Sequence, residues 1–186
     1  MEWIKKKSYI LTILTLVVYM ILLSWAIIFK CNAIDSDLRF GPRILVLIPF
    51  KMIIKQFSIN ELLIEVLLNI VAFMPLGILY SHLDNKSNLL KAIIVGIIVS
   101  LMYEVTQYII ALGTSDITDI IMNTTGSLLG YIIYRNTFAK MKEKTNNIVM
   151  ITCIIVGSIV SVYGIINTIN SFDQYMEFIN NGIYPM

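Results

Sequence analysis

The chain has 186 residues, of which 58% are hydrophobic and only 14% are charged. Soluble domains have about 45–50% apolar and about 25% charged residues, so an ordinary soluble domain is excluded. The formal net charge is +2, and the basic residues stand in short clusters beside apolar runs, which argues against nucleic-acid binding. We therefore predict an all-α polytopic membrane protein that forms a single membrane domain over residues 1–186.

Five segments predict transmembrane helices, which need about 20 mostly apolar residues each. The first is 9–29, which is too long for the apolar core of a signal peptide and is read as a retained helix. The others are 62–83, 89–112, 115–134 and 148–169. The segment 115–134 is the least apolar of the five, because acidic and amide side chains occupy its first half.

The basic residues predict the orientation in the cell membrane. With the N-terminus in the cytoplasm, nine of the 14 lysines and arginines fall on the inner side and five in the loop between the first two helices. The predicted multi-pass protein then has a cytoplasmic N-terminus and an extracellular C-terminus.

The loop between the first two helices contains a further apolar run at 44–57, which is interrupted by Pro49. This run is too short to cross a bilayer, so it predicts a re-entrant or interfacial segment.

Polar side chains recur at helical spacing within three of the predicted helices. Charges inside a membrane cost about 2.5–3.5 kcal/mol each on insertion scales, so they are candidates for function. Counted along each helix, the deeper groups lie about 10–12 Å below the same, outer surface. We therefore expect a polar pocket that opens outward. Its predicted members are Glu65, Asn69, Glu104, Gln107, Asp116, Asp119 and Asn123.

Small residues below these positions predict close helix packing. Gly126 and Gly130 form a GxxxG pair, and with Gly96 they predict tight contact between the third and fourth predicted helices. Pro75, with Gly77 just after it, predicts a kink in the second.

Purely structural roles for some of these residues also stay open. Asp116 and Asp119 are also suited to capping the fourth helix, and His82 is read as an interfacial residue. Because His82 is the only histidine and neither cysteine stands at ligand spacing, a zinc site is not expected. No metal site is assigned and no cofactor is expected, with Mg²⁺ left open as an alternative.

Three stretches resemble the VanZ-like family of membrane proteins, over roughly residues 40–135. They are RILVLIPF at 43–50, NIVAFMPLG at 69–77, and SLMYEVTQ at 100–107 followed by DITDIIMNTTG at 116–126. Val46 stands where the family usually has asparagine, and Thr114 and Ser115 stand where many members have an arginine. The resemblance implies an association with low-level resistance to the glycopeptide antibiotic teicoplanin.

The resemblance implies action at the outer leaflet on lipid, a lipid-linked cell-wall precursor or the access of a lipoglycopeptide antibiotic. The expected partners are therefore membrane lipids or lipid-linked envelope molecules, and not nucleic acid. Two alternatives stay open: an intramembrane enzyme that uses Mg²⁺ held by the acidic and amide oxygens to act on a lipid headgroup, and a small transporter or scaffold.

The crowded acids predict a cationic partner. The loop before the second helix supplies the nearby cations, and Arg43 suits a carboxylate best because its guanidinium binds in a bidentate fork. We predict that residues 43–50 fold back over the pocket as a helical lid broken at Pro49, with a flat amphipathic surface segment as the competing prediction.

Overall fold

The computed structural model describes residues 2–30, 44–51, 59–84, 86–110, 114–140, 151–159, 162 and 166. Within these residues the predicted all-α bundle is confirmed, because the long elements are helices and the strands are three residues each. The elements in chain order are α1 (Glu2–Lys30), β1 (Ile44–Val46), α3 (Ile59–Leu83), α4 (Leu89–Ile110), β2 (Thr114–Asp116), α5 (Ile117–Asn136) and η3 (Phe138–Lys140). Residues 151–159, 162 and 166 are also helical, and the other residues of the predicted fifth span lie outside the described residues.

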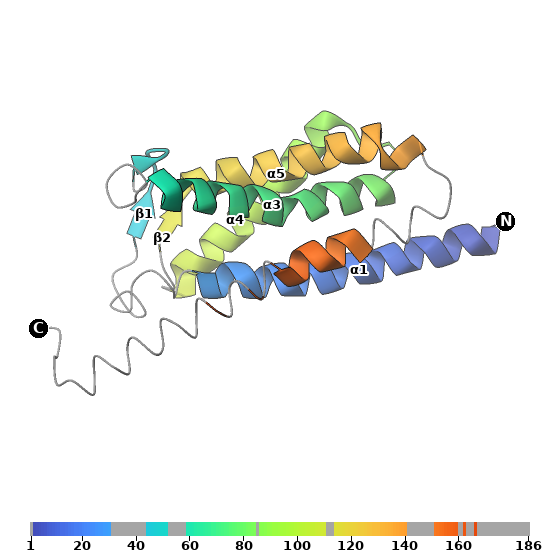
Figure 1. Cartoon of the computed structure of the whole chain (residues 1–186), viewed down its shortest axis with the longest axis horizontal. Coiled ribbons are helices and arrows are strands. Elements are labelled where there is room, and N and C mark those ends of the chain that lie inside the picture. The colour runs from blue at the N-terminus through green and yellow to red at the C-terminus, as the bar shows by residue number, and fades with distance from the viewer. Residues whose placement is uncertain are drawn as a thin grey trace, which may run out of the picture.

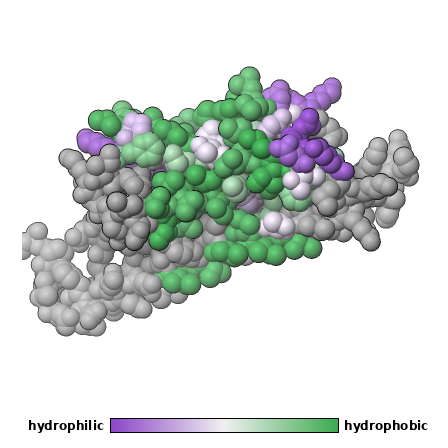
Figure 2. All heavy atoms as spheres, turned by 45° about the horizontal axis from the view of Figure 1, so that its top comes forward, coloured by the Kyte–Doolittle hydropathy of each residue, from purple (hydrophilic) through white to green (hydrophobic). Residues whose placement is uncertain are grey.

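Three helices are long and apolar enough to cross a membrane: Tyr9–Ile27 in α1, Leu63–Leu83 in α3 and Leu89–Ile110 in α4. The 22 residues of α4 extend about 33 Å, close to the thickness of a bilayer core. Figure 2 shows the matching surface, on which hydrophobic side chains cover the middle of the visible face and hydrophilic ones gather toward its ends. The chain is therefore a membrane protein.

Helix α5 is 20 residues long but is not among these apolar spans, as its polar first half predicts. It packs along both α3 and α4, while α1 lies against the same two helices (Figure 1). Its buried polar residues, Thr118, Asn123 and Ser127, therefore face other helices, where hydrogen-bond partners are available.

Glycines bring α5 and α3 into contact at backbone distance. A Cβ atom on Gly126 would overlap the carbonyl oxygen of Ile70, and one on Gly130 would overlap that of Met74. From the other side, a Cβ atom on Gly77 would overlap the carbonyl oxygen of Ser127. The prediction that the GxxxG pair packs against α4 is therefore wrong: it packs against α3.

The predicted contact between α4 and α5 rests on Gly96 alone among these glycines. An added Cβ atom there would lie 2.9 Å from Cβ of Ser127 on α5. Ser127 also donates a 3.0 Å hydrogen bond to the carbonyl oxygen of Ala92 on α4. The small residues of α5 thus pack against two helices: Gly126 and Gly130 contact α3, and Ser127 contacts α4.

Polar contacts hold α1 against the bundle. The fully buried Tyr19 donates its hydroxyl hydrogen to the carbonyl oxygen of Ala72 in α3. This carbonyl lies one residue after that of Val71, which Pro75 leaves without its usual intrahelical donor. The assigned helix α3 nevertheless continues through Pro75.

The two strands lie together at one end of the bundle, beside the start of α3 and of α5 (Figure 1). They are parallel, and Ile44 pairs with Thr114, Leu45 with Ser115 and Val46 with Asp116. Residues 44–46 are therefore a strand, and the prediction of a helix broken at Pro49 is wrong. A strand is favoured here because β2 offers a free backbone edge that a short isolated helix would leave unused.

Candidate functional site

Glu104 lies in the last two turns of α4, the helix that precedes β2 and α5 in the chain. It is 6% exposed, and its Oε2 atom accepts a 2.9 Å hydrogen bond from the backbone N–H of Asp116. The Ser115 hydroxyl donates a 2.8 Å hydrogen bond to the carbonyl oxygen of Glu104. The deepest acid of the sequence is therefore turned into the protein, where it holds the start of α5.

Asp116 caps α5. Its side chain accepts a 2.8 Å hydrogen bond from the backbone N–H of Thr118, in the N-cap position of the helix. The capping interpretation of Asp116 is thus confirmed. The cap also explains why α5 starts at residue 117, since an N-cap carboxylate satisfies an amide that has no intrahelical partner.

Asp119 is one turn further along α5 and connects it to α3. Its Oδ1 atom accepts a 2.5 Å hydrogen bond from Nδ2 of Asn69, which is 9% exposed. Glu65 lies one turn before Asn69 on α3 and is partly buried. The predicted approach of the Asn69 and Asp119 side chains is present.

Asn123 follows one turn below Asp119 and connects α5 to α4. Its Nδ2 atom donates a 2.9 Å hydrogen bond to Oγ of Ser100, and the side chain is 4% exposed. Its Oδ1 atom is buried and accepts no hydrogen bond from the part of the chain that the structure describes. This carbonyl oxygen remains available for a donor, such as a water molecule or a ligand group.

These contacts form a ladder along one end of α5. Successive turns at Asp116, Asp119 and Asn123 meet Glu104, Asn69 and Ser100 in that order. We call these six residues the polar ladder. With Arg43 counted, eight residues are predicted for the pocket, and the ladder contains five of them together with Ser100.

Gln107 is also buried, at 3% exposure, but its described hydrogen bond leads elsewhere. Its Nε2 atom donates to the carbonyl oxygen of Ile27 in α1 at 3.3 Å. One turn before it, Tyr103 and Ser24 of α1 share a 2.9 Å hydrogen bond between their hydroxyl groups. Sequence reasoning missed these α1 contacts, because a lone serine or tyrosine in an apolar run carries no signal of its partner.

The segment 44–50 lies against the ladder end through β2. After β1 the chain turns at Pro49 and Phe50, and the Phe50 backbone N–H donates a 2.8 Å hydrogen bond to Oγ1 of Thr118. Phe50 has a φ of 61°, which costs a side-chain-bearing residue about 1–2 kcal/mol. Arg43, the predicted partner of the acids, lies outside the described residues, so its ion pair stays a prediction.

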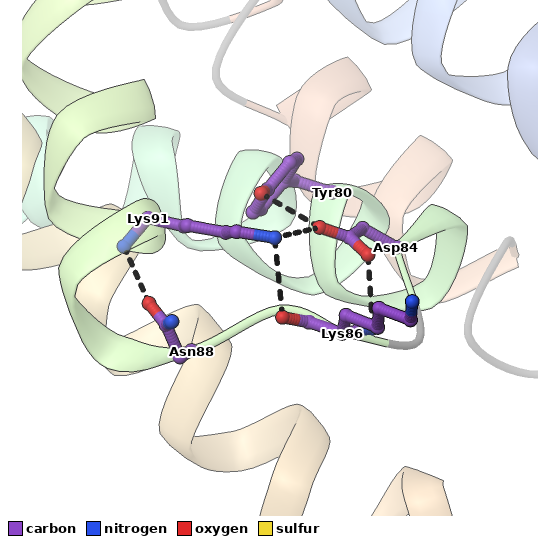
Figure 3. Close-up of polar contacts among 5 residues, drawn as sticks. All are labelled: Tyr80, Asp84, Lys86, Asn88 and Lys91. Carbon is purple, nitrogen blue, oxygen red and sulfur yellow. Dashed lines mark hydrogen bonds and ion pairs between the residues drawn. The ribbon is translucent and has the colours of Figure 1, made fainter.

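The opposite end of the bundle carries a different polar cluster, in the turn between α3 and α4 (Figure 3). Asp84 and Lys91 form a 2.9 Å ion pair, and Asp84 also accepts hydrogen bonds from the Tyr80 hydroxyl and the Lys86 backbone N–H. The Lys91 hydrogen bond is the main cause that lowers the pKa of the Asp84 carboxyl. These contacts stabilise the tight turn between α3 and α4.

His82 lies near the same end, partly buried, with its Nδ1 atom 3.1 Å from the Tyr134 hydroxyl on α5. Among the described residues, no group of three or more histidine, cysteine or acidic side chains is arranged to hold a metal ion. The described contacts of the ladder are hydrogen bonds among carboxylate, amide, hydroxyl and backbone groups of the chain itself.

Comparison with known proteins agrees with the sequence motifs. The family model for VanZ/LLP1 matches residues 14–140, from within α1 to the end of η3. Protein VanZ of Enterococcus faecium is 31% identical over 130 residues, which cover 69% of this chain and 76% of the relative. No solved structure matches the chain. On the family match and this identity, the chain is a member of the VanZ/LLP1 family.

Proposed function

We propose that this protein acts at the outer leaflet of the cell membrane, where it binds the headgroup region of an amphiphile and alters the access of teicoplanin-type antibiotics. The candidate amphiphiles are a membrane lipid, a lipid-linked cell-wall precursor and the acyl-tailed antibiotic itself. The observation that carries the proposal is the polar ladder, which gathers three carboxylates and two amides toward one end of a bundle whose exposed helix surface is largely apolar.

The position of the ladder favours a ligand that is itself part lipid. The exposed residues of α4 next to Glu104 are apolar, with Val105 47% and Ile109 65% exposed. A molecule that reaches the ladder from the bilayer therefore meets apolar side chains first and polar groups at the helix end. Only an amphiphile satisfies both surfaces.

Antibiotic susceptibility tests the proposal. The protein is expressed in a teicoplanin-susceptible bacterial host, and the minimal inhibitory concentrations of teicoplanin and of a glycopeptide without an acyl tail are compared. Glu104→Gln is the informative variant, because its amide oxygen still accepts the Asp116 N–H while the charge is removed. Asp84→Asn is the matched control at the opposite end of the bundle.

We expect the wild-type protein and Asp84→Asn to raise the inhibitory concentration of teicoplanin, and Glu104→Gln to lose most of this effect. The glycopeptide without an acyl tail should respond less. If Glu104→Gln protects as well as the wild type at equal membrane abundance, the ladder is not the functional site.

Lipids that co-purify with the protein provide a second test. Mass spectrometry of the wild type should reveal an enriched amphiphile that Glu104→Gln retains poorly. Conversion of that amphiphile on addition of Mg²⁺ would instead support the alternative of a metal-assisted enzyme.

A further inference from the structure

The turn that follows β1 exposes a cluster of apolar side chains outside any helix. Leu45 is 56% exposed, Leu47 66% and Ile48 58%, whereas Val46 between them is 7% exposed and faces the protein. Proteins in water rarely leave such a group uncovered unless it binds something. We refer to residues 45–50 as the β1 hook.

The backbone of the hook limits how deep it can lie. In the described part of the chain, β1 belongs to a two-stranded sheet and is paired with β2 along one edge. Open strand edges do not occur against lipid in the hydrocarbon core, because their N–H and C=O groups would have no partners. The hook therefore belongs at the interface, where water and headgroups can pair with the backbone.

Two features next to the hook are consistent with a position at the membrane interface. The last turn of α4, just before β2, exposes Ile109 at 65% and Ile110 at 51%, so lipid-facing surface lies close to the hook. Lys51 directly follows the hook in the chain, is exposed and suits anionic headgroups. An apolar cluster that has a lipid-facing helix nearby and a cation next to it in the chain is typical of a segment at the membrane interface.

The hook is also fixed to the polar ladder. The Phe50 N–H binds Thr118 in the first turn of α5, and Val46 pairs with Asp116 across the strands. The depth of the hook in the membrane therefore sets the depth of the ladder.

We propose that the β1 hook is a lipid-binding element that inserts its apolar side chains among the acyl chains of bilayer lipids, just below the headgroups. It thereby places Asp116, the first residue of the polar ladder, near headgroup level, with the ladder running inward from there. The inference rests on the proposed function only in placing this end of the bundle at the outer leaflet.

Depth-dependent fluorescence quenching tests the hook. Trp3 and Trp25 are replaced by phenylalanine, and one tryptophan is introduced by Ile48→Trp in the protein reconstituted into vesicles of phosphatidylcholine and phosphatidylglycerol. Two matched variants calibrate the depth: Ile98→Trp, 53% exposed near the middle of α4, and Lys86→Trp in the exposed α3–α4 turn. The quenchers are aqueous iodide and lipids with a nitroxide near the headgroup or near the chain end.

We expect Ile48→Trp to be quenched most by the shallow nitroxide, Ile98→Trp by the deep one and Lys86→Trp by iodide. Iodide quenching of Ile48→Trp equal to that of Lys86→Trp would overturn the proposal, and so would deep quenching equal to that of Ile98→Trp. Should Ile48→Trp fail to give monodisperse protein, Leu47→Trp replaces it with the same expectations. The quenching assay measures depth in the membrane and not antibiotic resistance. It can therefore contradict the hook proposal while the susceptibility assay supports the proposed function, or the reverse.

Discussion

Substituting Gly130 by alanine tests the backbone contact between α3 and α5. The added methyl group would overlap the carbonyl oxygen of Met74, and a backbone atom cannot move aside as the end of a side chain can. Overpacking costs about 1–3 kcal/mol, and we expect the upper end here. Alanine regains about 1 kcal/mol of helix propensity over glycine, so the net loss should be about 2 kcal/mol.

Two other glycines provide a graded control. In Gly157→Ala the methyl group would meet a ring carbon of the buried Tyr19 at 3.3 Å, a tight contact that should offset the gain in helix propensity, so this variant should be close to neutral. In Gly96→Ala it would lie 2.9 Å from Cβ of Ser127, and an intermediate loss is expected. The assay is unfolding by SDS in mixed micelles, followed by far-UV circular dichroism. If Gly130→Ala were as stable as Gly157→Ala, α3 and α5 would not be in backbone contact, and the packing described above would be refuted.

Three further variants test single contacts. Tyr19→Phe removes the hydrogen bond to the Ala72 carbonyl and should lower the free energy of unfolding by about 1 kcal/mol in the same assay, and an unchanged value would contradict the docking of α1 through this bond. Thr118→Val removes the acceptor of the Phe50 N–H, so hydrogen exchange of that amide should accelerate, whereas Thr118→Ser should preserve the slow rate. The pKa of the Asp84 carboxyl is lowered in the folded protein. Its contribution to folding stability is therefore complete above the unfolded-state pKa and is lost as the pH falls through the lower folded-state pKa. Asp84→Asn should remove this dependence, so that the free energy of unfolding changes less with pH in the acidic range.

The helices of the described region could be predicted closely from the sequence. The apolar runs at 62–83 and 89–112 correspond to α3 (Ile59–Leu83) and α4 (Leu89–Ile110). This succeeds because lipid imposes length and hydropathy on each spanning helix separately, without reference to its neighbours. Orientation follows from the distribution of basic residues alone and stays a prediction.

The contacts between elements were harder to predict. The GxxxG pair of Gly126 and Gly130 predicts close approach but does not say to which helix, and α3 and α4 both border α5. The short strand β1 was also missed, because its partner lies 70 positions away, as Ile44 pairs with Thr114, and three apolar residues read equally well as helix or strand. Pairing that arises from tertiary proximity leaves little trace in local sequence.

Some of the contacts of the candidate site could be predicted from the sequence, for a physical reason. Carboxylates and amides are costly inside a membrane, so those that persist are expected to meet partners at a shared level. Asn69 and Asp119 do so through a direct hydrogen bond, and Glu104 reaches the backbone of Asp116. Depth counted along each helix indicated which helices would contribute polar groups, whereas the individual partners could not be predicted and the depth in the membrane stays a prediction.

The ladder has a consequence for how its function must be tested. Helix α5 is less apolar than its neighbours, and its polar residues are compensated by groups on α3 and α4. The residues proposed to bind a ligand are therefore the same ones that hold α5 in place. An alanine at Glu104 would leave the Asp116 N–H without its acceptor, and lost resistance would then report lost structure as readily as lost binding. Only substitutions that keep the hydrogen bond and change the charge, such as Glu104→Gln, separate the two roles.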